Sequence, residues 1–128
     1  MTGVPLLGPD PDEPLAGPRE DLVVSVRAIE GAQVLTVEGT VDIRTAARLS
    51  EAVTEVMARR PARVVIDLTA VDFLASAGLH VLLVAQHAAG EHTLLRVVAT
   101  GPSLRSLSLT ALDEVLAVYP TLSDATGS

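Results

Sequence analysis

The chain has 128 residues, which is enough for one domain with a single buried core. It contains no cysteine, so disulfides, thiolate catalysis and cysteine-ligated zinc are excluded, in keeping with a cytoplasmic protein. The net charge is -7 and there is one Phe, one Tyr and no Trp, a composition that repels phosphates and offers bases almost no stacking surface. We therefore expect a protein partner and no nucleic acid.

Residues 1–20 contain five prolines among glycine and acidic residues and show no apolar periodicity. They are predicted to be a flexible leader, with the folded domain over residues 21–125 and a tail at 126–128. Two β-branched runs follow, at 22–29 and 32–41, separated by Glu30-Gly31. This pattern predicts two antiparallel strands joined by a tight turn.

Residues 42–61 change to the period of an amphipathic helix. Apolar residues recur there at spacings of three and four, at Ala46, Leu49, Val53 and Val56. Asp42 is expected to cap the N-terminus of this helix, and Glu55 is expected to pair with Arg59 one turn later. Pro61 ends the pattern.

The second half of the chain alternates strands with helices. Residues 63–69 predict a short strand, 76–90 a helix that stops at Gly90, 93–100 a strand and 115–120 a last strand. Gly101-Pro102-Ser103 ends the strand over 93–100 and opens a last helix, with Ser103 as its expected cap and a buried side formed by Leu104, Leu107, Ala111 and Leu112. Residues after 122 are expected to add a frayed turn.

The predicted order is ββαβαβαβ, which indicates an α/β domain. Strand-helix-strand connections favour parallel strands, so we expect a mixed, mostly parallel sheet of about five strands with helices mainly on one face. The apolar stretch after Leu79 is broken by His80, Gln86 and His87 well short of a membrane span, and membrane insertion is not expected.

Ser76 lies where a strand passes into an apolar helix, in the stretch "FLASAGL". It is interpreted either as a helix N-cap or as a serine that accepts a phosphoryl group, because a helix N-terminus tolerates an anion. Gly78 either lets a partner approach closely or lets the helix pack tightly on the sheet. Asp42, Asp67 and Asp72 are expected to cap or turn the chain, or to converge near Ser76.

Catalytic and metal sites find little support in the residues. His80 lies four residues from Ser76 on the same predicted helix, and the G-x-S-x-G turn of serine hydrolases is absent. The spacing of His80, His87 and His92 is that of ordinary helix and surface histidines. We expect no enzyme activity, no metal and no cofactor.

Three stretches resemble the STAS domain, and within it the bacterial anti-sigma factor antagonists. They are "VLTVEGTVDIRTAARLSEAV", "RVVIDLTAVDFLASAGLHVLLVA" and "LSLTALDEVLAVYPTLSDA", and the resemblance covers residues 22–125. It implies that the protein binds an anti-sigma factor that is a GHKL-type serine kinase, releases a sigma factor, and is switched off by phosphorylation of Ser76. A phosphatase would reverse the modification, and the protein would be a monomer or weak dimer.

The resemblance also implies which residues meet the partner: Asp42, Asp72, Phe73, Ala75, Ser76, Ala77, Gly78 and His80. Ala75 and Ala77 stand where family members commonly carry polar residues, and Ala111 stands where a Gly is common. The altered flanks of Ser76 favour an alternative, a STAS adaptor subunit of a membrane transport assembly such as a lipid-transport ATPase, with no phosphorylation. A small enzyme or ligand-binding domain is a second alternative.

Overall fold

The computed structural model describes residues 22–127, and the expected leader over 1–20 lies outside them. Strand β1 (Leu22–Ile29) pairs antiparallel with β2 (Ala32–Val41), because Glu30 and Gly31 both take positive φ angles, 51° and 84°. That geometry is typical of the two-residue turn whose twist matches the flanking strands. The predicted hairpin is confirmed.

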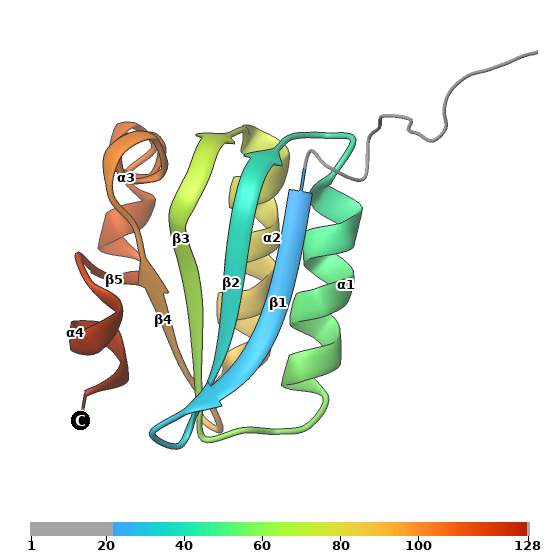
Figure 1. Ribbon diagram of the computed structural model, residues 1–128, viewed down its shortest axis with the longest axis vertical. Helices are drawn as coiled ribbons and strands as arrows, with labels where there is room; N and C mark the ends of the chain where they lie inside the picture. Colours follow the sequence, from blue (N-terminus) through green and yellow to red (C-terminus); the bar gives the residue numbers. More distant parts are fainter. Residues whose placement is uncertain (1–21, 128) are drawn as a thin grey trace, which may run out of the picture.

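The sheet has five strands in the order β1-β2-β3-β4-β5. Strands β3 (Arg63–Leu74), β4 (Leu94–Val98) and β5 (Ala117–Tyr119) continue it, and β2 to β5 run parallel to one another. Figure 1 shows β1 at one edge and the short β5 at the other. The mixed, mostly parallel sheet is as predicted.

Three helices cover one face of the sheet and close the main core. Figure 1 shows α1 (Ala46–Met57) and α2 (Ser76–Ala89) behind the strands, and α3 (Gly101–Leu109) follows β4. The buried residues Leu49, Val53 and Val56 of α1 are those that the periodicity indicated, and α2 stops before Gly90. No helix among residues 22–127 has the length and apolar character needed to cross a bilayer.

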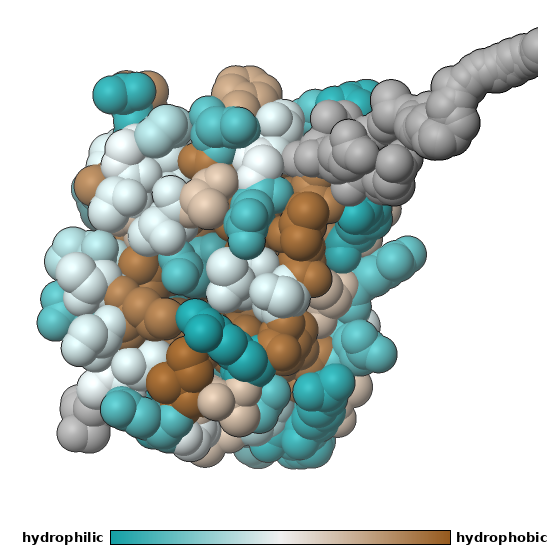
Figure 2. Space-filling view, in the orientation of Figure 1, coloured by the Kyte–Doolittle hydropathy of each residue, from teal (hydrophilic) through white to brown (hydrophobic). Residues whose placement is uncertain are grey.

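A small second core lies on the opposite face of the sheet. Helix α4 (Leu122–Thr126) packs there through Ala125, against Ala32, Val34, Val65 and Val98. The rest of this face is a mixture of apolar and hydrophilic side chains (Figure 2).

The expectation of a frayed turn after 122 is wrong, because two arginines hold α4 to the sheet. Arg63 donates to the carbonyl oxygen of Thr126 at 2.8 Å, and Arg96 donates to those of Ala125 and Gly127. These bonds satisfy carbonyls that a helix C-terminus otherwise leaves without partners.

Strand β3 runs to Leu74 rather than ending near 69. Its register with β2 shifts between Thr36 and Glu38 and again between Gly39 and Thr40. Such bulges insert extra residues into one strand and hide its continuity from a period-two reading of the sequence. The longer strand carries the chain directly to the start of α2.

The start of α3 also differs from the prediction. Thr100 is the residue before the helix, and Ser103 lies inside it, fully buried, where its hydroxyl donates to the carbonyls of Leu68 and Thr100. Leu107 is buried but Leu104 is 37% exposed. The expected Ser103 cap is therefore wrong, since the serine joins α3 to β3 instead.

Ala111 follows α3 in the left-handed region, with φ 62° and ψ 16°. A side chain in this conformation costs about 1 kcal/mol or more, a cost that glycine avoids. Replacing Ala111 by Gly should raise the free energy of unfolding by about 1 kcal/mol, measured by urea denaturation.

Ala58 provides the matched control, because it ends α1 with a φ of -65°. Ala58→Gly should lower the free energy of unfolding, since only chain entropy changes there. Equal effects of the two glycines would contradict the assignment of strain to Ala111.

Candidate functional site

The parallel strands β2 and β3 end at the same edge of the sheet, and α2 begins there. The backbone N–H of Ala75 donates to the carbonyl of Val41 at 2.8 Å, so the link between β3 and α2 is fixed to the end of β2. Asp42, Asp72 and Ser76 all follow or lie close to these strand ends. The structure brings these three together at one edge.

Ser76 is the first residue of α2 and is exposed. Ala75 occupies the cap position with extended backbone and no side-chain cap bond, so the interpretation of Ser76 as an N-cap is wrong. Among residues 22–127 no group hydrogen-bonds the Ser76 hydroxyl. Its oxygen is therefore accessible and engaged by no neighbour in the described part of the chain.

Two of the four backbone N–H groups in the first turn of α2 have an acceptor within residues 22–127 and two do not. Gly78 and Leu79 donate their N–H groups to the Ala75 carbonyl, at 2.9 and 3.1 Å. Those of Ser76 and Ala77 have no partner among the described residues. Free N–H groups and the helix dipole both favour negative charge at this position.

Gly78 is buried against the ends of both strands. A Cβ atom at this position would lie 2.5 Å from Cγ1 of Val41 and 2.7 Å from Cδ1 of Leu74. Of the two interpretations of this glycine, tight packing of the helix on the sheet is therefore the one that the contacts support.

Asp42 organises the turn from β2 into α1. Its Oδ1 accepts the N–H groups of Arg44 at 2.9 Å and Thr45 at 3.2 Å, and its own N–H donates to Oγ1 of Thr45. This reciprocal pair stabilises the turn that precedes α1. The cap position of α1 is Thr45, with no side-chain cap bond, so the expectation that Asp42 caps this helix is wrong.

The Asp42 carboxylate also forms an ion pair with the Arg44 guanidinium at 3.1 Å. Desolvation raises the pKa of Asp42, but the hydrogen bonds from Arg44 and Thr45 and the Arg44 charge outweigh it, so the pKa lies below its usual value.

Asp72 and Phe73 lie at the second register shift of β3, and both are exposed. The Asp72 carboxylate accepts a hydrogen bond from the hydroxyl of Thr40 at 3.1 Å, which joins the ends of the two strands. The expectation that Asp67 also converges here is wrong. Asp67 is buried in mid-strand, bonded to Thr69, and lies roughly 20 Å of strand away from Leu74.

Sequence reasoning missed Ile43, which is 85% exposed beside Asp42. The sequence pattern gave no signal of this exposure, because Ile43 lies three residues before Ala46 and so matches the spacing of the apolar stripe of α1. His80 is exposed on α2, one turn after Ser76. No group of three or more potential metal ligands occurs within residues 22–127.

Residues 23–125 match the STAS domain family. The chain belongs to the STAS domain family. It is 39% identical over 107 residues to the anti-sigma-F factor antagonist RsfB of Mycobacterium tuberculosis, an alignment that covers 83% of this chain and 88% of that protein. The resemblance identified from the three sequence stretches is confirmed at the level of the family.

Solved structures agree with this assignment. An anti-sigma factor antagonist from Mycobacterium paratuberculosis superposes with a TM-score of 0.80 at 39% identity, covering 87% of this chain and 95% of that one. The antagonist SpoIIAA in its unphosphorylated form superposes with a TM-score of 0.62 at 10% identity, over 80% of this chain and 92% of that one. At that identity the likeness concerns the fold alone.

Gly78→Ala should destabilise the domain by about 1–3 kcal/mol, because the added methyl group overlaps Val41 and Leu74 in a packed core. The free energy of unfolding from urea denaturation measures this. In a helix Ala is ordinarily more favourable than Gly, so without the overlap the substitution would stabilise the domain. A stabilised variant would therefore contradict the close packing.

Asp42→Asn should make the stability less dependent on pH in the acidic range. The folded-state pKa of Asp42 is lowered, so its charge stabilises the fold fully above the unfolded value of about 3.9 and ceases to do so as pH falls through the folded value. Urea denaturation from pH 7 to pH 3 should show the wild-type advantage shrinking below about pH 4. An advantage that persists unchanged in acid would contradict the role of the charge.

Proposed function

We propose that this protein is an anti-sigma factor antagonist that binds an anti-sigma factor through the edge around Ser76 and is switched off when Ser76 is phosphorylated. The observation that carries the proposal is the accessible, unbonded hydroxyl of Ser76 at the start of α2. The 39% identity to an anti-sigma-F factor antagonist supports the class of partner. The function is regulatory, in the cytoplasm, and requires no catalysis by this chain.

A phosphate on Ser76 would be tolerated by the fold. It would lie beside the free N–H groups of Ser76 and Ala77, where the helix dipole favours an anion. Because Ser76 is exposed and its hydroxyl makes no bond to a neighbour, the modification breaks no internal contact. The fold therefore survives while the surface gains about -1.5 to -2 charges.

The same surface is suited to a protein partner. Ile43 is 85% exposed and Phe73 is 55% exposed, and both lie at the edge where Ser76 is found. Large apolar side chains surrounded by polar groups are typical anchors of protein interfaces. A doubly charged group on this surface would have to be desolvated on binding, which opposes association.

The partner surface in this proposal comprises Asp42, Asp72, Phe73, Ala75, Ser76, Ala77, Gly78 and His80, with Ile43 added. Ala75 and Ala77 have methyl side chains, so their side chains provide no polar contact to orient the hydroxyl. Asp72 does not replace them, because it makes no hydrogen bond to the Ser76 hydroxyl; its Oδ1 accepts one from Thr40. A kinase must therefore orient Ser76 with its own groups. We infer that the anti-sigma factor is itself that kinase, of the GHKL type, and that a phosphatase restores the active form.

Incubation with the cognate kinase and ATP should add one phosphate to the chain, and Ser76→Ala should abolish this addition, as measured by intact-protein mass spectrometry.

Ser76→Glu should weaken binding of the anti-sigma factor by about tenfold or more in calorimetry, because the charge lies within the contact surface.

Ser108→Ala is the matched control, since Ser108 is an exposed serine near the C-terminal end of α3, on a different helix from Ser76. The Ser108→Ala variant should be phosphorylated, and should bind the anti-sigma factor, as the wild type does. Stoichiometric phosphorylation of Ser76→Ala would overturn the assignment of the site. If Ser76→Ala used as bait captures transporter subunits in place of an anti-sigma factor, the adaptor alternative replaces the proposal.

A further inference from the structure

Strand β1 exposes a row of backbone hydrogen-bonding groups at the edge of the sheet. In a two-residue hairpin the residues that flank the turn bond to each other, so Ile29 and every second residue before it face β2. The backbone groups of Val24, Val26 and Ala28 then point outward. Arg48 supports this assignment, because its Nη2 bonds the outward carbonyl of Leu22 at 2.6 Å.

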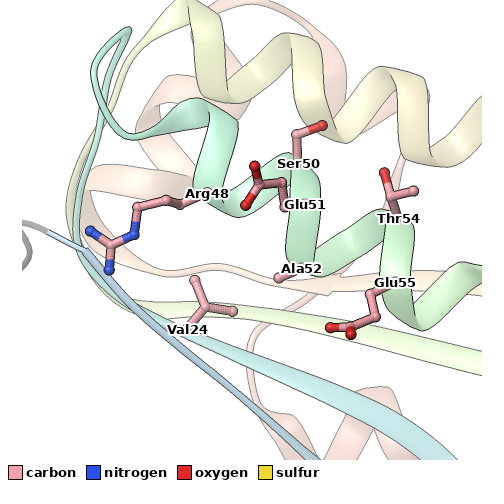
Figure 3. A pocket seen from close by; sticks show the side chains of 7 residues that line it. All are labelled: Val24, Arg48, Ser50, Glu51, Ala52, Thr54 and Glu55. Atoms are coloured by element: carbon pink, nitrogen blue, oxygen red, sulfur yellow. The ribbon is translucent and has the colours of Figure 1, made fainter.

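A groove of about 660 Å³ runs between this edge and α1. Figure 3 shows Val24 on the strand facing the helix, with Arg48 at the end of the groove nearest the start of β1. Glu51, Ala52 and Glu55 lie along the side of α1 that borders the groove. The edge and the groove are thus two parts of one surface.

The carboxylates of the groove have no cationic partner among the described residues. The expected ion pair between Glu55 and Arg59 is not formed, and Glu51 makes none either. Arg48, the one cation of the lining, is turned to the carbonyl of Leu22. The lining of the groove therefore holds two carboxylates and one guanidinium, a net charge of -1, and neither carboxylate is paired with a cation among the described residues.

We propose that the β1 edge binds an extended segment of a partner protein with Lys or Arg at alternate positions. Such a segment would add a sixth strand by bonding the outward groups of Val24, Val26 and Ala28. Alternate side chains of a strand point to one face, so the basic ones would enter the groove and pair with Glu51 and Glu55. This surface is separate from the Ser76 edge.

Charge complementarity selects this occupant over the alternatives. A second copy would bring its own Glu51 and Glu55 to the same place, and each copy has a net charge of -7. The segment before Leu22 holds five acidic residues and one Arg, so it too is repelled by the groove. Among these three occupants, only a basic segment forms favourable interactions with both the open strand and the carboxylates.

The test uses the full chain and a synthetic peptide in which Lys alternates with Thr. Amide NMR should show shifts confined to β1 and α1, and the N–H groups of Val24, Val26 and Ala28 should become protected from hydrogen exchange. Val26→Pro should weaken binding by about tenfold, because it removes an outward donor and leaves the bonds to β2 intact. Val26→Ala, which keeps the donor, is its control and should bind like the wild type.

The double variant Glu51→Gln, Glu55→Gln should bind about fivefold more weakly. Glu38→Gln, an exposed carboxylate on the opposite face of the sheet, should not differ from the wild type. Ser76→Glu should also bind the peptide normally, which separates this proposal from the phosphorylation switch.

Three results would overturn the inference. One is unchanged peptide binding by Val26→Pro. Another is protection of Val24, Val26 and Ala28 in the free monomer, which would show that the chain covers its own edge. The third is protection that arises only in a dimer detected by sedimentation, which would identify the occupant as a second copy.

Discussion

The close contact of α2 with the ends of β2 and β3 is the constraint on which the site depends. At Gly78 there is no room for a methyl group against Val41 and Leu74, and one residue before the helix the Ala75 N–H is bonded to the Val41 carbonyl. The first turn of α2 is therefore held against the sheet on one side. Ser76 lies on the opposite side of that turn from Gly78, and its side chain is exposed.

This arrangement separates the stability of the domain from the charge on its surface. The groups that hold the edge together are backbone atoms, buried apolar side chains, the Asp42–Thr45 pair and the Thr40–Asp72 hydrogen bond, and none of them bonds the Ser76 hydroxyl. A charge added to the Ser76 hydroxyl therefore alters the binding surface without breaking the contacts that stabilise the fold. The acidic groove beside β1 is likewise built from side chains that contribute little to the core, since Glu51 and Glu55 are exposed on α1.

Features that depend on residues adjacent in the chain were predictable from the sequence, whereas features that depend on contacts across the fold were not. The stripe of α1, the Glu30-Gly31 turn and the stop at Gly90 each depend on residues adjacent in the chain, and all three are confirmed. The Ser103 cap and the end of β3 were mispredicted. In both cases a contact across the fold decided the outcome, a bond to Leu68 in one and the bulged pairing with β2 in the other.

The sequence by itself determined the order of the strands and helices up to β5, the STAS resemblance and the position of Ser76 at a strand-to-helix joint, because these follow from local pattern and motif. Only the tertiary structure decided that Asp72 joins Thr40, that Asp67 is remote, that Ile43 is exposed and that Glu51 and Glu55 border an open strand. Each of these depends on distances between residues far apart in the chain. Such distances are set by strand register and helix packing, which a one-dimensional pattern does not contain.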